Sequence, residues 1–305
     1  MIIKNENINY SEILISVVTI TYGHDKYIVD TIEGILKQNY IGPIEFIIAN
    51  DNSPDNTDKT IREYLENTVI PQNIEIKYTC HKENKGVISN FNWALMQSQG
   101  KYIAICEGDD YWIDSNKLKI QVDFLEKNQE YSMCFHNALK DYDVNKTDNF
   151  NTSRKSGEIK IEDIINSWII PTASIVIRKS ILPLPNWFLN VYSGDQTLAL
   201  LAISKGKVFY FDMIMSVYRI LLRNNTSMSS QVRKKSEYIL NEHIKLYSYY
   251  LDDSLCTNKK IIEKKINHLK KELKFQQLKK KHIFLTFIQM PVYTFSKLKQ
   301  KFFEE

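Results

Sequence analysis

The sequence lacks the cysteine and glycine patterns that mark several common kinds of functional site. Its four cysteines, Cys80, Cys106, Cys134 and Cys256, lie far apart and form no C-x-x-C pair. Neither a zinc site nor a disulfide framework is therefore predicted, and a reducing cytoplasm suits the chain. No G-x-G-x-x-G follows the first predicted strand and no G-K-S/T motif occurs. Those absences argue against dinucleotide-dependent enzymes and P-loop NTPases.

Long apolar runs are missing as well. No segment approaches the ~20 apolar residues that a membrane-spanning helix requires, and residues 1–10 lack the apolar core of a secretory signal. Charge is unevenly distributed: residues 231–305 carry 17 Lys and Arg against 8 Asp and Glu, whereas the preceding 230 residues carry 23 against 28. The chain of 305 residues is therefore expected to combine a mildly acidic α/β body with a basic tail.

The most distinctive stretch is an apolar run that ends in three acids. Tyr102–Cys106 has the pattern of a strand covered on both faces, and Glu107, Asp109 and Asp110 follow it directly. In α/β sheets ligands collect at the carboxyl edge of the strands. Carboxylates this close repel one another unless a cation or hydrogen-bond donors compensate, which favours Mn²⁺ or Mg²⁺. The alternative is a solvated acidic turn that caps the next helix.

The first half of the chain alternates predicted strands with predicted helices. The strands lie at residues 13–20, 44–49, 74–79 and 102–106. One helix is expected at residues 26–39, a second reaches about Glu66, and a third runs through Phe91 and Leu95 and stops at Gly100. Such a series requires a parallel sheet with helices on both faces. The loops after three of its strands then share one edge and bring Thr21-Tyr22, Asp51 and the acids together. There Tyr22 is suited to stack on a base, and Asp51 to accept a hydrogen bond from a uracil imide.

The second half is less regular. It predicts a helix through residues 118–125, strands at 131–136, 173–177, 208–211 and 214–218, helices at 159–168 and from 193, and polar loops at 140–157 and 223–231. The remainder is predicted to be helical, with a break near Pro291. Residues 259–281 form a basic amphipathic segment that suits packing, self-association or an anionic membrane surface. No nucleic-acid recognition motif is present, so no nucleic-acid partner is expected.

From about residue 15 to residue 219 the sequence resembles family 2 glycosyltransferases of the GT-A fold. The motifs that carry this resemblance are Val17–Tyr22, Ala49–Ser53, Asn84–Gly86 and the Glu107–Trp112 form of the DxD motif, in family order. The resemblance implies a Rossmann-like, mostly parallel sheet flanked by helices. It places a glycosyltransferase domain at residues 1–232, with a donor half at about 13–112 and an acceptor half at about 113–232. A helical appendage at residues 233–305 follows.

The resemblance also implies roles for single residues. Asp51 contacts the uracil, Glu107 the ribose region, and Asp109 the metal that bridges the diphosphate, while Asp110 braces the loop. The remaining nucleotide-sugar contacts would come from Thr21, Tyr22, Asn84, Lys85, Asn92 and Gly108. For Asn92 and Lys85 the alternative is an ordinary solvent-facing side chain.

Inverting transfer requires a base that takes the proton from the acceptor hydroxyl. The Gly194-Asp195 pair matches the family position of this base, and the alternative is that Asp195 caps a helix. Where many relatives carry a histidine, this sequence has Leu221, which leaves Arg219 or Arg223 as candidate diphosphate contacts. His24 and His136 are further candidate site residues, and the alternative for each is a structural or exposed histidine.

The predicted function is inverting transfer of a hexosyl or N-acetylhexosaminyl group from a UDP-sugar to a glycan or lipid-linked glycan, in surface polysaccharide synthesis. The expected location is the cytoplasm, with the basic tail as a peripheral contact to the inner face of the plasma membrane. The alternative role of the basic tail is to form a homo-oligomer. The alternative function is a catalytically inactive subunit that binds sugar nucleotides or glycans. A metal-dependent phosphotransferase fits poorly, because Thr21-Tyr22 stands where a nucleophilic Asp is needed.

Overall fold

Four parallel strands form the first part of the sheet, as the strand–helix alternation predicts. The computed structural model describes residues 9–142, 146–220 and 236–285, and within them ten strands form one mixed sheet. The parallel strands are adjacent in the order β3 (Ile74–Cys80), β2 (Ile44–Asn50), β1 (Ile15–Thr21) and β4 (Tyr102–Ile105). Every residue of β1, β2 and β4 is buried, which explains their nearly continuous apolar sequences.

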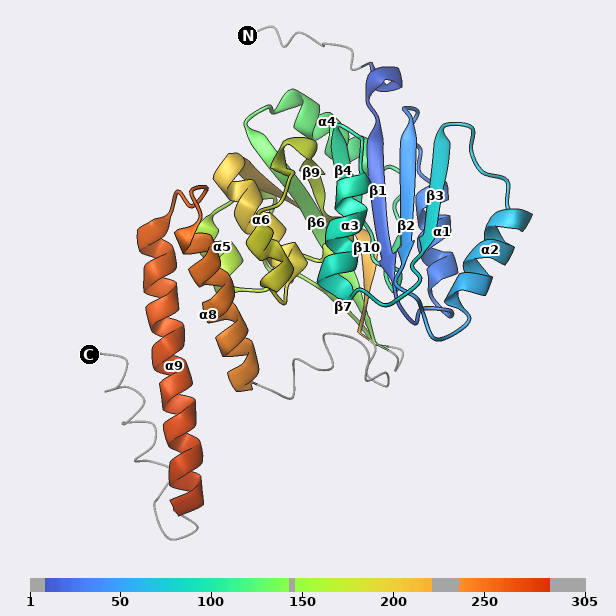
Figure 1. The fold of residues 1–305 in the computed structure, drawn as a ribbon. Coiled ribbons are helices and arrows are strands. Elements are labelled where there is room, and N and C mark those ends of the chain that lie inside the picture. The colour runs from blue at the N-terminus through green and yellow to red at the C-terminus, as the bar shows by residue number, and fades with distance from the viewer. Residues whose placement is uncertain (1–8, 143–145, 221–235, 286–305) are drawn as a thin grey trace, which may run out of the picture. The chain divides into compact units, whose positions relative to one another are not determined.

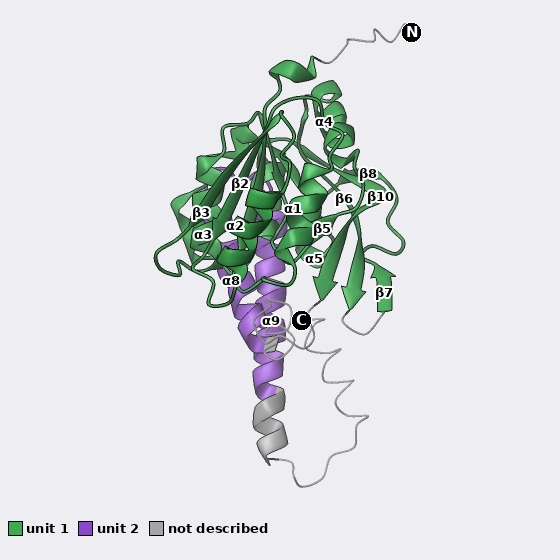
Figure 2. Cartoon of the chain, turned by 90° about the vertical axis from the view of Figure 1, so that its right-hand side faces the viewer, with its two compact units in different colours: residues 1–227 green, residues 228–305 purple. Residues whose placement is uncertain are grey.

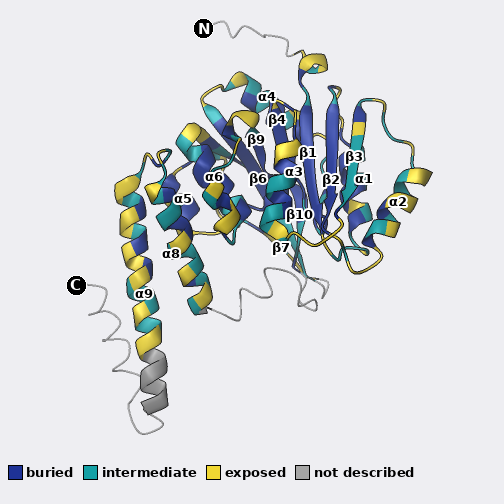
Figure 3. Ribbon diagram, in the orientation of Figure 1, coloured by how far each residue is buried: buried dark blue, intermediate teal, exposed yellow. Residues whose placement is uncertain are grey.

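Helices cover both faces of these strands. They are α1 (Ile28–Leu36), α2 (Thr57–Asn67) and α3 (Val87–Gln97). Figure 1 shows α3 in front of the parallel strands and α1 behind them. In α1 the residues Ile28, Ile32 and Ile35 are buried at helical spacing, so the amphipathic pattern determines which face packs on the sheet. Figure 3 shows the resulting buried layer along the strands.

The second half of the sheet mixes strand directions. β9 (Val176–Arg178) is antiparallel to both β4 and β6 (Tyr131–Tyr142), and β6 is parallel to β10 (Lys207–Ile220). The short strand β5 (Tyr111–Trp112) is antiparallel to β10. The other elements of this half are α4 (Lys117–Lys127), α5 (Ile161–Asn166), α6 (Gly194–Lys205) and 3₁₀ turns at Tyr10–Glu12, Thr172–Ser174, Lys179–Ile181 and Asn186–Asn190.

Two features of this half differ from the sequence prediction. The two strands predicted at 208–211 and 214–218 are the single strand β10, whose pairing with β6 shifts between Phe211 and Ile214. Residues 140–157 are not a continuous loop, because β6 extends to Tyr142, β7 (Lys146–Asn149) pairs with β6 and β8 (Gly157–Ile159) pairs with β10. Sheet pairing supplies backbone hydrogen bonds to polar segments that have no hydrophobic alternation, so composition alone misses them.

The chain divides into two compact units, residues 1–227 and 228–305 (Figure 2). The second unit contains α8 (Ser236–Asp252) and α9 (Lys259–Leu285), which pack against each other. On α9, Ile262, Ile266 and Leu269 are buried, while four lysines of its first half are exposed. No helix among the described residues is long and apolar enough to cross a membrane. The predicted boundary at 232/233, together with Leu221, Arg223 and Pro291, lies outside the described residues.

Candidate functional site

The loops after β1, β2 and β4 meet at one edge of the sheet. The backbone N–H of Asp51 donates to the carbonyl of Thr21 at 2.9 Å, and that of Gly108 donates to the carbonyl of Ile20 at 3.0 Å. Parallel register produces this convergence, because β1 lies between β2 and β4. The structure therefore brings the three predicted loops into direct contact.

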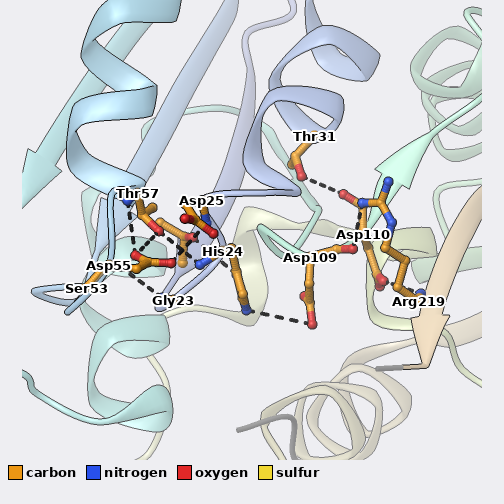
Figure 4. A network of polar contacts seen from close by, with 11 residues as sticks. Gly23, His24, Asp25, Thr31, Ser53, Asp55, Thr57, Asp109, Asp110 and Arg219 are labelled. Carbon is orange, nitrogen blue, oxygen red and sulfur yellow. Dashed lines mark hydrogen bonds and ion pairs between the residues drawn. The ribbon is translucent and has the colours of Figure 1, made fainter. Parts of the chain in front are cut away.

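Side chains that follow β2 hold the loop that follows β1. Three successive backbone N–H groups of that loop donate to side-chain oxygens: Gly23 to Ser53 Oγ at 3.1 Å, His24 to Thr57 Oγ1 at 2.9 Å, and Asp25 to Asp55 Oδ2 at 3.1 Å. Figure 4 shows this network. The polar run after β2 thus has a structural task that the sequence did not reveal.

Tyr22 is presented outward by the same loop. Its side chain is 41% exposed, whereas Thr21 beside it is buried. An exposed aromatic ring at the carboxyl edge of a sheet is free to stack on a planar ligand.

Asp51 is almost fully buried and its carboxylate is already in use. It accepts hydrogen bonds from the backbone N–H groups of Lys85 at 2.7 Å and Gly86 at 2.9 Å, while its carbonyl accepts one from Asn84 at 3.2 Å. Gly86 has a φ of 82°, a conformation that glycine adopts readily. Asp51 therefore fixes the loop before α3. A carboxylate oxygen has a second lone pair, so the uracil contact stays a prediction.

On α3 the buried, hydrogen-bonded asparagine is Asn90 and not the predicted Asn92. Asn92 is only partly buried, and Asn84 and Lys85 are exposed. Asn90 is buried, donates to the carbonyl of Ala49 at 3.0 Å, and pairs with His81 Nε2 at 2.9 Å. Sequence reasoning missed Asn90, because a polar residue in a helix does not reveal which way it points.

The acidic loop after β4 is packed tightly against the loop after β1. A Cβ on Gly108 would lie 2.6 Å from Thr21 Oγ1 and 3.0 Å from His24 Nδ1. Only glycine fits such a contact without displacing its neighbours. Gly108 thus brings the backbone of Asp109 close to Thr21 and His24.

Glu107 and Asp110 are strongly affected by burial and by neighbouring acids. Burial, Asp109 and Asp195 raise the pKa of Glu107 to about 8, although a hydrogen bond from Thr172 opposes them. Burial and the charges of Asp109 and Glu107 raise the pKa of Asp110 well above its usual range. In the absence of a cation, burial and mutual repulsion thus favour the neutral form of both carboxyl groups.

Asp110 lies beneath this loop and braces it. Its Oδ1 accepts a hydrogen bond from the backbone N–H of Arg219 at 2.8 Å, and its carbonyl accepts one from Thr31 Oγ1 at 2.6 Å. Its Oδ2 is buried and has no hydrogen-bond partner among the described residues.

Arg219 connects β10 to the acidic loop. Its guanidinium donates to the carbonyl of Asp109 at 3.0 Å, forms an ion pair with Asp30, and lies 4.3 Å from the ring centre of Tyr111 and 5.1 Å from that of Tyr27. Two of its N–H donors and two aromatic rings thus engage the guanidinium. The diphosphate contact predicted for it stays a prediction, and bracing is the role its contacts favour.

Asp109 is the one acid of this loop that turns toward a histidine. Its Oδ2 lies 3.9 Å from His24 Nε2, and both side chains are about one-fifth exposed. Among the described residues, no group of three or more His, Cys, Asp or Glu side chains is gathered as a complete metal site. His136 is fully buried, and its Nδ1 lies 2.7 Å from the carbonyl of Asn137, which indicates a structural role.

Asp195 lies in the first turn of α6, one residue after its start. Its Oδ1 accepts hydrogen bonds from Ser193 Oγ at 2.5 Å and the backbone N–H of Gln196 at 2.7 Å. Within the described part of the chain, its Oδ2 makes one long contact, of 3.5 Å, to Thr172 Oγ1. One carboxylate oxygen thus contacts the helix start, although the N-cap residue of α6 is Ser193 and not Asp195, and the other oxygen is less engaged.

Thr172 is a second residue that sequence reasoning missed. Its hydroxyl contacts both Asp195 and Glu107 from the turn before β9. No sequence signal distinguishes this threonine from other loop hydroxyls.

Comparison with known proteins points to one family. The sequence model described as glycosyl transferase family 2 matches residues 16–182. An uncharacterized protein of Mycobacterium tuberculosis is 33% identical over 186 residues, covering 58% of this chain and 52% of the relative. The chain thus spans about half the length of that relative. A putative teichuronic acid biosynthesis glycosyltransferase of Bacillus subtilis is 27% identical over 241 residues, covering 77% of this chain and 90% of the relative.

Solved structures share the fold. Staphylococcus aureus TarS (residues 1–349) in complex with UDP-GlcNAc superposes with a TM-score of 0.62 at 16% identity, covering 84% of this chain and 71% of TarS. The mannosyltransferase PcManGT of Pyrobaculum calidifontis, in complex with GDP-Man and Mn²⁺, gives a TM-score of 0.55 at 14% identity, covering 84% and 73%. At these identities the likeness establishes the GT-A fold alone.

Proposed function

Because the chain belongs to glycosyltransferase family 2, we propose that it transfers a sugar from a UDP-sugar to an acceptor hydroxyl with inversion at the anomeric carbon. The observation that carries this proposal is the cluster formed by Glu107, Asp109 and Asp195 at the carboxyl edge of the sheet. Glu107 and Asp109 supply carboxylates for a metal diphosphate, and Asp195 supplies a carboxylate whose Oδ2 makes a long contact to Thr172 Oγ1. Those are the two groups that inverting transfer requires.

A divalent metal, Mn²⁺ or Mg²⁺, fits this cluster. Burial above all, and then Asp109 and Asp195, raise the pKa of Glu107, and the buried Oδ2 of Asp110 lacks a partner among the described residues. Oxygen ligands suit both metals, and such ions are often held by one or two carboxylates together with substrate phosphates. We assign the metal to Asp109. When bound, the metal neutralises charge on the departing diphosphate.

The donor half, at about residues 13–112, would hold the nucleotide. The exposed ring of Tyr22 is positioned to stack on the uracil, and the exposed Asn84 and Lys85 flank the same edge. Asp51 keeps their loop in place, and Glu107 faces the ribose. Thr21, Gly108 and Asn92 shape the pocket, the first two through their mutual close packing.

The acceptor half, at about residues 113–232, would supply the base. Asp195 Oδ2 takes the proton of the acceptor hydroxyl as that oxygen bonds to the anomeric carbon and the bond to the diphosphate breaks. Ser193 and Gln196 hold Oδ1 and thereby fix the orientation of the carboxylate. A carboxylate held by hydrogen bonds on one side is suited to act from the other.

We further propose that the acceptor is a glycan or a lipid-linked glycan of a surface polysaccharide. An Escherichia coli relative, 34% identical over 115 residues that cover 37% of this chain and 41% of the relative, is named a UDP-Glc:α-D-GlcNAc-diphosphoundecaprenol β-1,3-glucosyltransferase. The exposed lysines of α9 suit an anionic membrane surface, and the appendage at 233–305 is assigned that role at the cytoplasmic face.

The proposal is tested by transfer and binding assays on the full chain. A panel of UDP-sugars and GDP-sugars is screened by thermal shift with and without Mn²⁺, followed by transfer to undecaprenyl-diphosphate-linked acceptors. We expect a shift that requires both a uridine nucleotide and metal, and turnover that Asp195→Asn abolishes while UDP binding is kept. UDP binding without any turnover would favour a non-catalytic sugar-nucleotide-binding subunit instead.

A further inference from the structure

His24 is built into the edge of the candidate site, where it faces Asp109. Figure 4 shows the imidazole pointing from the loop after β1 toward the carboxylate of the acidic loop. The separation between His24 Nε2 and Asp109 Oδ2 is 3.9 Å. Neither side chain is buried completely, so a bound substrate can reach both.

The position of this imidazole is determined from several sides. The backbone N–H of His24 donates to Thr57 Oγ1, and its carbonyl accepts the N–H groups of Tyr27 and Ile28, which begin the first turn toward α1. The ring Nδ1 lies 3.2 Å from Thr21 Oγ1, and the missing side chain of Gly108 leaves room for it. With Nδ1 engaged, Nε2 is the nitrogen directed at Asp109.

The 3.9 Å separation between His24 Nε2 and Asp109 Oδ2 fits shared ligation of one metal ion better than a direct hydrogen bond. It is longer than the ~3.2 Å limit of a good N–H···O hydrogen bond. It is shorter than the about 4.2 Å that two metal–ligand bonds of about 2.1 Å span when opposed. One ion can therefore bind both atoms. Metal-binding histidines also usually engage their other ring nitrogen in a hydrogen bond, as Nδ1 does here with Thr21.

We propose that His24 Nε2 is a protein ligand, together with Asp109, of the divalent metal that accompanies the nucleotide diphosphate. The assignment rests on the proposed function, since the metal is expected to bind with the UDP moiety. It explains how a loop without three gathered ligands holds an ion: two protein groups suffice when phosphate oxygens and water complete the shell. A nitrogen ligand also favours a transition metal such as Mn²⁺ over Mg²⁺, which prefers oxygen.

The test measures metal coordination directly and needs no turnover. Mn²⁺ is bound to the full chain in the presence of UDP, and pulsed electron paramagnetic resonance records whether a ¹⁴N nucleus of an imidazole couples to the ion. We expect this coupling in the wild type and its loss in His24→Gln. The Mn²⁺ dissociation constant, measured with UDP by calorimetry, should rise at least about tenfold in this variant. The Mg²⁺ dissociation constant should rise less.

Control variants separate ligation from folding and from the proposed function. His268→Gln removes an exposed histidine of α9 and should leave the coupling unchanged. Metal-free UDP affinity and the thermal midpoint of His24→Gln should match the wild type. Mn²⁺ bound with UDP but without ¹⁴N coupling would overturn the assignment of His24 and leave the proposed function intact. A wild type that transfers sugar without binding any metal would overturn both metal assignments.

Discussion

Asp51 and Asp109 occupy similar positions and have opposite environments. Each follows a buried parallel strand, and their loops meet at the same edge of the sheet. The carboxylate of Asp51 accepts two backbone N–H groups and is nearly inaccessible. Asp109 instead lies among other acids and is partly exposed. The contrast teaches that a carboxylate with satisfied hydrogen bonds organises a loop, whereas an uncompensated one marks a place for a cation.

The largest effect is expected from Asp109→Asn. If Asp109 binds the metal, the loss of several kcal/mol of charge stabilisation should reduce transfer by about 10³-fold or more. The same variant should raise the thermal midpoint without metal, because it removes repulsion from Glu107 and Asp110. Asp148→Asn on β7 is the matched control and should change neither quantity. Full transfer activity in Asp109→Asn would show that Asp109 is not needed as a cation site. The functional contrast between Asp109 and Asp51 would then be wrong.

Asp195 is intermediate between Asp51 and Asp109. Its Oδ1 accepts two hydrogen bonds, whereas its Oδ2 makes one long contact. Asp195→Asn should lower kcat by about 10²- to 10⁴-fold, the usual contribution of a general base. UDP affinity, measured by calorimetry, should stay within a factor of two or so of the wild type, because Asp195 lies in the acceptor half. Parallel loss of UDP binding and thermal stability would instead assign Asp195 to the group of structural carboxylates with Asp51.

Asp51→Asn should chiefly destabilise the protein. The amide offers one acceptor oxygen in place of two, so either the Lys85 N–H loses its side-chain acceptor or the Gly86 N–H keeps only its second one, Asn84 Oδ1 at 3.0 Å. Loss of such a bond to a charged group costs about 1–3 kcal/mol, which chemical denaturation measures. Glu83→Gln, at an exposed position in the loop before α3, provides a control. Unchanged stability together with a specific loss of UDP affinity would show that Asp51 acts mainly on the nucleotide.

The smallest effect concerns a buried cation behind the acidic loop. Lys117 Nζ lies 2.8 Å from Gln121 Oε1 and 4.0 Å from the ring centre of Trp112, and burial lowers its pKa to about 7. Between that value and its ordinary pKa the unfolded chain binds a proton that the native state does not. Stability should therefore rise with pH over this window.

Lys117→Met removes this titration while keeping the side-chain volume. The free energy of unfolding of the wild type, relative to the variant, should increase from pH 7 to pH 9.5 in urea titrations. If the unfolding free energies of the wild type and the variant changed in parallel with pH, Lys117 would stay charged in the native state, as a cation compensated by its neighbours.

Sequence patterns predicted the parts of the fold that rest on hydrophobic periodicity. Continuous apolar runs identified β1, β2 and β4, and the strand–helix alternation identified their parallel order. The motifs after these strands identified the shared edge. The polar segments β7 and β8 escaped prediction because they have no hydrophobic alternation of their own. β7 pairs in a hairpin with the preceding end of β6, and β8 pairs with the distant strand β10. Arg219 was predicted as a ligand contact, and its ion pair and ring contacts come from elements about 110 to 190 residues away in the chain.

By itself the sequence determined which residues are apolar enough to form buried strands, and hence which loops carry carboxylates to the edge. Tertiary structure alone decided how each carboxylate is used. Asp51 is compensated because the loop before α3 folds back onto it, whereas Asp109 lies beside other acids and 3.9 Å from His24. Asp195 uses one oxygen at a helix start and makes a long contact to Thr172 with the other. Hydrogen-bond satisfaction depends on which groups meet in three dimensions, and residue order does not encode it locally.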